Sequence, residues 1–111
     1  MKLLFLISFS IVLAGCEIGY DPRVEVNPKA PVLEITNFTD NPVFFYAIAK
    51  EVADTTQLAN PCDEFDPNLS PNTTLDFPYQ NITGYTEETV SVFFLWTNCK
   101  GQNDSDTYPL Y

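Results

Sequence analysis

The sequence predicts an all-β fold, organised as a small antiparallel β-sandwich in residues 32–111. Several short runs alternate apolar and polar side chains, which is the period-2 pattern of strands with one buried face. Proline, asparagine and aspartate separate these runs, as they do at turns between strands. No stretch of useful length carries the apolar stripe of an amphipathic helix. The chain of 111 residues leaves room for one such domain.

The first predicted strand is residues 32–37, with Leu33 and Ile35 on one face. Turn residues at 38–42 separate it from an apolar, aromatic run at residues 43–49. We therefore expect these two segments to pair as an antiparallel hairpin. Both faces of residues 43–49 are apolar, which predicts a strand that is buried on both sides.

The second half of the domain contains two more predicted strands and a third short one. Residues 50–72 are irregular, apart from one helical turn within residues 51–58. A half-exposed strand is expected at residues 72–77, ended by Pro78. The strongest strand pattern lies at residues 90–97. A polar turn over residues 100–107 and a last edge strand at residues 108–111 complete the prediction.

The N-terminus carries the pattern of an exported protein. Lys2 precedes an apolar stretch that is shorter than the roughly 20 residues of a spanning helix, so residues 1–15 are typical of a signal peptide. Leu13-Ala14-Gly15-Cys16 then matches a lipobox. In these features the chain resembles bacterial lipoproteins, which implies lipid attachment at Cys16 and a membrane anchor through its acyl chains. The alternative is an ordinary secretory signal cut after a small residue.

Residues 16–31 are interpreted as the lipidated tether. Prolines at positions 22, 28 and 31 favour an extended chain, and about 3.1 Å per residue would give a reach on the order of 45 Å. The alternative is a first edge strand that includes Val24 and Val26. Glu17 after the lipidated cysteine favours the outer membrane of the bacterial envelope over the inner one, and surface exposure is left open.

Lipidation of Cys16 leaves Cys62 and Cys99 as a pair. In an oxidising compartment the two are expected to form a disulfide, the alternative being two reduced, buried thiols. Because Cys99 ends the central strand, an immunoglobulin-like arrangement fits the pattern. Its usual Cys, Trp, Cys order is not kept, since Cys62 lies in a loop and Trp96 is on the strand of Cys99. An open barrel is the other alternative.

Further segments of the domain resemble small lipoproteins of Bacteroidota whose function is not established. The resemblance covers residues 32–97 and implies no activity. Where those proteins often have Pro-Gly, this chain has Pro71-Asn72. The segments that carry the resemblance are ITNFTDNPVFFY at 35–46, PNT at 71–73, ITGY at 82–85 and FLW at 94–96.

Charge and composition exclude several classes of function. Fifteen acidic and five basic residues give a net charge of −10, which disfavours nucleic acid and anionic lipid as partners. The chain has no histidine, so Ser-His-Asp and Cys-His catalysis are excluded. A carboxylate pair could serve a hydrolase, but a domain this small offers little cleft. The acids available to it are Asp63, Glu64, Asp66, Glu87 and Glu88. We therefore expect a protein that is not an enzyme and uses no cofactor.

Two kinds of binding site are candidates. Oxygen-rich runs at residues 63–68 and 103–106 could hold Ca²⁺, although neither has EF-hand spacing and turn formation explains both. Core packing is the first explanation of the aromatic residues, but they occupy both faces of two strands, which leaves a surplus that could form an exposed patch. The residues proposed for this binding surface are Phe44, Tyr46, Tyr85 and Trp96. The sequence thus predicts a membrane-anchored, non-catalytic envelope lipoprotein that binds a protein or is structural; the alternative is a cell-surface glycan- or calcium-binding module.

Overall fold

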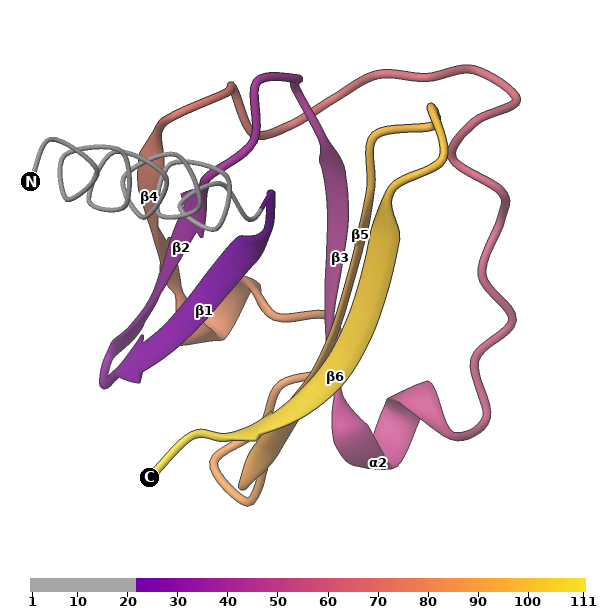
Figure 1. Ribbon diagram of the computed structural model, residues 1–111. Coiled ribbons are helices and arrows are strands. Elements are labelled where there is room, and N and C mark those ends of the chain that lie inside the picture. The colour runs from indigo at the N-terminus through magenta and orange to yellow at the C-terminus, as the bar shows by residue number, and fades with distance from the viewer. Residues whose placement is uncertain (1–21) are drawn as a thin grey trace, which may run out of the picture.

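The computed structural model describes residues 22–111, in which two antiparallel sheets face one another (Figure 1). The first sheet has the order β1-β2-β4, and the second has the order β3-β5-β6. The strands of the first sheet are β1 (Val24–Lys29), β2 (Val32–Asn37) and β4 (Thr74–Pro78). Those of the second are β3 (Phe44–Ala49), β5 (Ser91–Thr97) and β6 (Asn103–Pro109). The short helix α2 (Lys50–Ala53) follows β3, and the 3-10 turn η1 (Tyr79–Asn81) follows β4.

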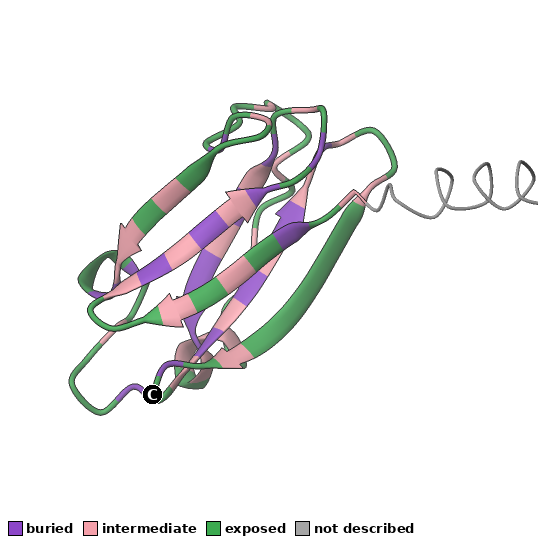
Figure 2. Cartoon of the chain, turned by 60° about the vertical axis from the view of Figure 1, so that its left-hand side comes forward, coloured by how far each residue is buried: buried purple, intermediate pink, exposed green. Residues whose placement is uncertain are grey.

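The core lies between the two sheets. Leu33 and Ile35 of β2 are fully buried, as their alternation with polar residues predicts. Phe45 of β3 stacks on Phe94 of β5, with ring centroids 5.3 Å apart. The Phe45 ring also meets Phe77 of β4 edge-on at 5.5 Å, so one aromatic cluster joins both sheets. Figure 2 shows the alternation of buried residues along the strands. The small antiparallel sandwich is confirmed.

The proposed tether is wrong over residues 24–29, which form β1. This strand pairs with β2 along its whole length, from Val24 opposite Asn37 to Lys29 opposite Val32. Val24 is buried in the core, and Val26 packs against it. Proline 28 is tolerated because β1 is an edge strand. The alternative with Val24 and Val26 in an edge strand is therefore the correct one, while residues 16–21 of the proposed tether lie outside the described part of the chain.

The predicted hairpin between residues 32–37 and 43–49 is also wrong, because β2 and β3 belong to different sheets. The link between them is held by the side chain of Asn37, which is fully buried. Its amide group donates to the carbonyl oxygens of Asn41 at 2.9 Å, Ser70 at 3.1 Å and Leu69 at 3.3 Å. Its Oδ1 accepts from the backbone N–H and the hydroxyl of Thr39. These bonds turn the chain across the sandwich instead of back along one sheet.

Residues 103–107, expected to be part of a polar turn, form most of β6. The strand pairs with β5 from Ser91 opposite Pro109 to Thr97 opposite Asn103. Only one β6 side chain reaches the core, that of Tyr108, whose ring lies 6.4 Å from that of Phe94. Aspartate is rare in strands, but here backbone pairing with a central strand outweighs that preference.

The remaining elements follow the sequence pattern closely. β5 begins one residue later than expected, and Val90, which precedes it, is 66% exposed. β4 begins two residues late and ends at Pro78. The single turn of helix expected within residues 51–58 is α2, at residues 50–53.

The Cys62–Cys99 disulfide is confirmed, with the two Cα atoms 5.6 Å apart. It joins the long loop, which we define as residues 54–73, to the end of β5. This loop runs beside the β3-β5-β6 sheet before crossing to β4 (Figure 1). Within residues 22–111 no disulfide connects one sheet to the other, so the bridge of an immunoglobulin domain is absent from this part of the chain.

Candidate functional site

Phe44 and Tyr46 lie on the outer face of β3, turned away from the core. They alternate with Phe45 and Ala47, which are buried between the sheets. Their rings meet edge to face, with centroids 4.9 Å apart and an interplanar angle of 81°. Both are half-buried. The outer face of the sheet therefore presents an ordered aromatic pair at its β3 edge.

The long loop forms a wall beside this aromatic pair. The Tyr46 hydroxyl donates a hydrogen bond of 3.0 Å to the carbonyl oxygen of Ala59. Three residues further on, the disulfide fixes Cys62 to Cys99. The Asn60 side chain accepts a 2.9 Å bond from the backbone N–H of Cys62, which closes a local turn. The loop is thus attached to the sheet at both ends of residues 59–62, through Ala59 and through Cys62.

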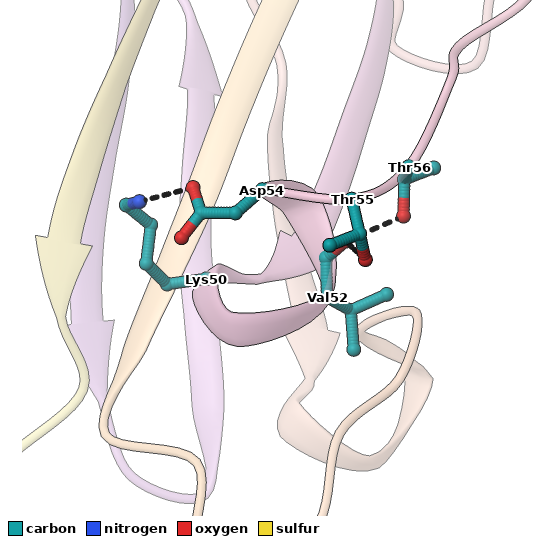
Figure 3. A network of polar contacts seen from close by, with 5 residues as sticks. All are labelled: Lys50, Val52, Asp54, Thr55 and Thr56. Carbon is teal, nitrogen blue, oxygen red and sulfur yellow. Dashed lines mark hydrogen bonds and ion pairs between the residues drawn. The ribbon is translucent and has the colours of Figure 1, made fainter.

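The beginning of the long loop is held at α2 (Figure 3). Lys50 Nζ pairs at 2.5 Å with Asp54, which is four residues further along the chain and caps the end of the helix. The hydroxyl groups of Thr55 and Thr56 donate to the carbonyl oxygen of Val52 at 3.2 and 2.6 Å. These bonds fix the direction in which the chain leaves the helix.

Between the aromatic pair and the loop is a hollow of about 430 Å³, which we call the aromatic-acidic hollow. Its size falls in the range of small-ligand sites. One side is apolar and the other carries three exposed carboxylates. The lining residues are Phe44, Tyr46, Ala59, Asn60, Pro61, Asp63, Glu64 and Asp66.

The edge of β3 that does not pair with β5 is already occupied by loop residues. The Asn68 side chain imitates a neighbouring strand, accepting from the Phe45 N–H at 3.0 Å and donating to the Phe45 carbonyl at 3.2 Å. Leu69 bridges to Val43, and Thr83 bonds to the backbone of β3 further along. Strand addition by a partner is therefore blocked here, and binding at β3 must use its outer face.

A second hollow, of about 470 Å³, lies at the opposite end of β3, where η1 and the last residues meet the β1–β2 turn. We call it the tyrosine hollow. The Tyr79 hydroxyl donates to the Leu110 carbonyl at 2.8 Å, and the hydroxyl groups of Tyr85 and Tyr111 are 3.1 Å apart. None of its lining side chains is charged, so its aromatic rings suit a neutral ring such as a sugar. The lining residues are Ala30, Pro31, Val32, Pro78, Tyr79, Gln80, Tyr85 and Tyr111.

Tyrosine ionisation should make the folded state sensitive to alkaline pH. Burial, and then the neighbouring Tyr111, raise the pKa of Tyr79 above its ordinary value of 10.0. Because the unfolded chain releases this proton first, the stabilisation is complete below pH 10 and is lost as pH rises through the higher native pKa. We expect the melting temperature to fall above about pH 10.

Melting curves between pH 7 and 11.5 check this expectation. Tyr79→Phe should melt lower at pH 7, because the Leu110 carbonyl loses its partner, yet show a shallower alkaline decline. An alkaline decline as steep as that of the unmodified chain would contradict the assignment to Tyr79.

The four residues expected to form one binding surface lie in three places. Phe44 and Tyr46 are together in the aromatic-acidic hollow, and Tyr85 is in the tyrosine hollow. Trp96 is wrongly assigned, because it is only 6% exposed and packs in the core. Its position on β5 opposite Phe45 puts it on the inward face, as strand parity alone implies.

Sequence reasoning missed that residues 63–66 face Phe44 and Tyr46. The signal lay in the expected disulfide, because Phe44 pairs with Thr97 and the bridge to Cys99 therefore brings residues 62–66 to the same end of β3. Tyr79 and Tyr111 had no such signal, since long-range packing alone places them beside Tyr85.

The proposed metal and carboxylate sites gain no support from the geometry. Among residues 22–111, no three Asp, Glu, Cys or His side chains converge as a metal site requires. Asn68, one of the expected oxygen ligands, uses its side chain on the backbone of Phe45. The acids considered for hydrolysis are all exposed.

Cys16, the predicted site of lipid attachment, lies outside the described residues. Within residues 22–111, none of the helices is long and apolar enough to cross a membrane. A scan against protein-family models gives no match, and searches of curated proteins and of solved structures give none either.

Proposed function

We propose that this chain is a non-catalytic lipoprotein of the bacterial envelope, anchored through acyl chains on Cys16, whose sandwich binds another protein. The lipobox at residues 13–16 supports the anchor. The aromatic-acidic hollow carries the binding proposal. The Tyr46–Ala59 hydrogen bond and the disulfide fix the long loop beside the aromatic pair, so a partner meets a preformed surface.

Several features support binding over catalysis at this hollow. Aromatic side chains are the groups most enriched at the centres of protein interfaces. Histidine is absent from the chain. Outside the hollow, the large apolar residues that are exposed in the described part of the chain are Phe38, Val90 and Tyr111. These lie singly on different segments, which is normal for a surface.

The anchor is tested with the full chain in a bacterial host that is fed a labelled fatty acid. We expect label on the protein and recovery in the membrane fraction. Cys16→Ala should abolish both, since one thiol carries the attachment, while the Cys62–Cys99 bridge and the β-sheet circular dichroism stay unchanged. A Cys16→Ala protein that is still membrane-bound would refute the anchor.

Binding is tested in the same cells by chemical cross-linking. We expect the double variant Phe44→Ala/Tyr46→Ala to lose specific cross-linked products, each hot-spot aromatic contributing about 2 kcal/mol or more to an interface. The matched control Phe38→Ala/Val90→Ala removes apolar side chains of the ordinary surface and should keep those products. Identical products for both variants would contradict binding at this hollow.

One further variant, Tyr85→Ala, separates protein binding from the alternative function. A neutral oligosaccharide that binds the purified chain and is lost on Tyr85→Ala, but not on Phe44→Ala/Tyr46→Ala, would favour a glycan-binding module that uses the tyrosine hollow.

A further inference from the structure

We infer that the occupant of the aromatic-acidic hollow is a basic segment of a partner protein, with an Arg or Lys side chain seated over Phe44 and Tyr46. This inference rests on the proposed function, because it specifies the chemistry of the partner that the hollow binds. It is supported by two features of one preformed hollow. Phe44 and Tyr46 form an aromatic floor, and Asp63, Glu64 and Asp66 form an acidic wall.

The floor places two aromatic rings beside the hollow. A guanidinium or ammonium group within about 6 Å of an aromatic centroid is attracted by the ring quadrupole. The chain already makes one such contact elsewhere, where the Arg23 guanidinium lies 4.6 Å from the centroid of Phe38. The edge-to-face packing of Phe44 and Tyr46 keeps their rings at a steep angle, so a long side chain can contact both.

The wall supplies three carboxylates that form no ion pair with the described residues. Asp63, Glu64 and Asp66 are exposed, and within residues 22–111 none of them makes an ion pair. The ion pairs of the described chain lie elsewhere, and they use Arg23, Lys29 and Lys50. A cationic side chain on the aromatic floor would find its counterions on this wall.

Other occupants fit the hollow less well. An apolar segment would bury the three carboxylates without compensation, which is costly. A metal ion lacks three converging ligands in the described residues. An added strand finds the edge of β3 occupied by Asn68, Leu69 and Thr83. Nucleic acid and anionic lipid are repelled by a chain with net charge −10, whereas a basic segment is attracted to it.

The probes are four labelled hexapeptides in which glycine alternates with arginine, lysine, glutamine or leucine. They are titrated against the purified full chain by fluorescence anisotropy. We expect binding of the arginine and lysine peptides only, with arginine tighter because its planar group stacks on aromatic rings. Affinity should fall as salt rises.

Two matched triple variants locate the charge. Asp63→Asn/Glu64→Gln/Asp66→Asn neutralises the wall with little change in shape and should weaken the arginine peptide about tenfold. Asp76→Asn/Glu87→Gln/Glu88→Gln removes the same total charge from exposed sites elsewhere and should change affinity by no more than about twofold. Phe44→Ala/Tyr46→Ala should weaken the same peptide about three- to thirtyfold.

The outcomes separate the two proposals. Equal binding of the glutamine and arginine peptides, or equal losses in the two triple variants, would overturn the basic-segment inference. Cross-linking that still depends on Phe44 and Tyr46 would then leave the proposed function standing. Cross-linking that ignores these two residues would overturn the proposed function itself.

Discussion

Replacing Cys62 and Cys99 together by serine is expected to lower the free energy of unfolding by about 4 kcal/mol. The bridge joins residues 37 positions apart, and the segment between them contains β4 and β5. Without the bridge, the unfolded chain regains the conformational freedom that a closed loop of this length denies it. Urea denaturation of the full chain, followed by tryptophan fluorescence, measures the change.

The reduced, unmodified chain is the control for this loss. It should unfold at the same urea concentration as the double serine variant, because both lack only the covalent bridge. We also expect the arginine peptide to bind the double variant more weakly, since the wall of the hollow is then held by the Tyr46–Ala59 bond without the disulfide. Equal midpoints for the oxidised chain and the double variant would show that the native loop needs no covalent constraint.

Asn37→Ala is expected to cost on the order of 3 kcal/mol, since each buried polar group left without a partner costs about 1–3 kcal/mol. The Asn37 side chain is fully buried, and its amide group donates hydrogen bonds to the carbonyl groups of Asn41, Leu69 and Ser70. Alanine offers neither the donor nor the acceptor of this planar amide group. Thermal and urea unfolding measure the loss.

Asn37→Asp is the informative companion to this variant. It keeps the oxygen that accepts from Thr39 but turns the donor that faces three carbonyl groups into an acceptor. We expect it to be at least as destabilising as alanine at neutral pH, because a buried carboxylate would face carbonyl oxygens. An alanine variant with nearly unchanged stability would contradict a structural role for Asn37.

The parts of the fold that could be predicted are those in which local pattern and burial agree. β2 has the predicted bounds because Leu33 and Ile35 alternate cleanly with polar neighbours. β5 was expected for the same reason, with Val92, Phe94 and Trp96 buried. The disulfide could be predicted by counting cysteines once Cys16 was set aside.

The errors arise where backbone pairing overrides local composition. β1 contains Pro28 and β6 contains two aspartates, yet both are edge strands whose hydrogen bonds go to a well-formed neighbour. Because residues 32–37 and 43–49 are neighbours in sequence, a hairpin was predicted. No neighbouring residue indicated that the Asn37 side chain donates to the carbonyl groups of Leu69 and Ser70. Contacts between residues this far apart in the sequence cannot be inferred from the pattern of neighbouring residues.

The candidate site, like the fold, could be predicted from the sequence only in part. The outward position of Phe44 and Tyr46 follows from alternation with Phe45 and Ala47. The expected Cys62–Cys99 bridge indicates which end of β3 the acidic residues lie near, because Phe44 pairs with Thr97. Their exact placement depends on the path of the long loop, which only the tertiary structure defines.

The position of β1 also determines which end of the sandwich faces the proposed anchor. Val24 lies opposite Asn37, and the Arg23 carbonyl accepts a 2.8 Å bond from the N–H of Phe38, so the chain enters the domain where the link to β3 begins. Phe44 starts β3 at this same end. Residues 17–23 can span no more than about 25 Å when fully extended. If Cys16 is acylated as proposed, this short connection would keep the Phe44 end of the sandwich within about 25 Å of the bilayer, where basic segments close to the lipid surface could reach the hollow.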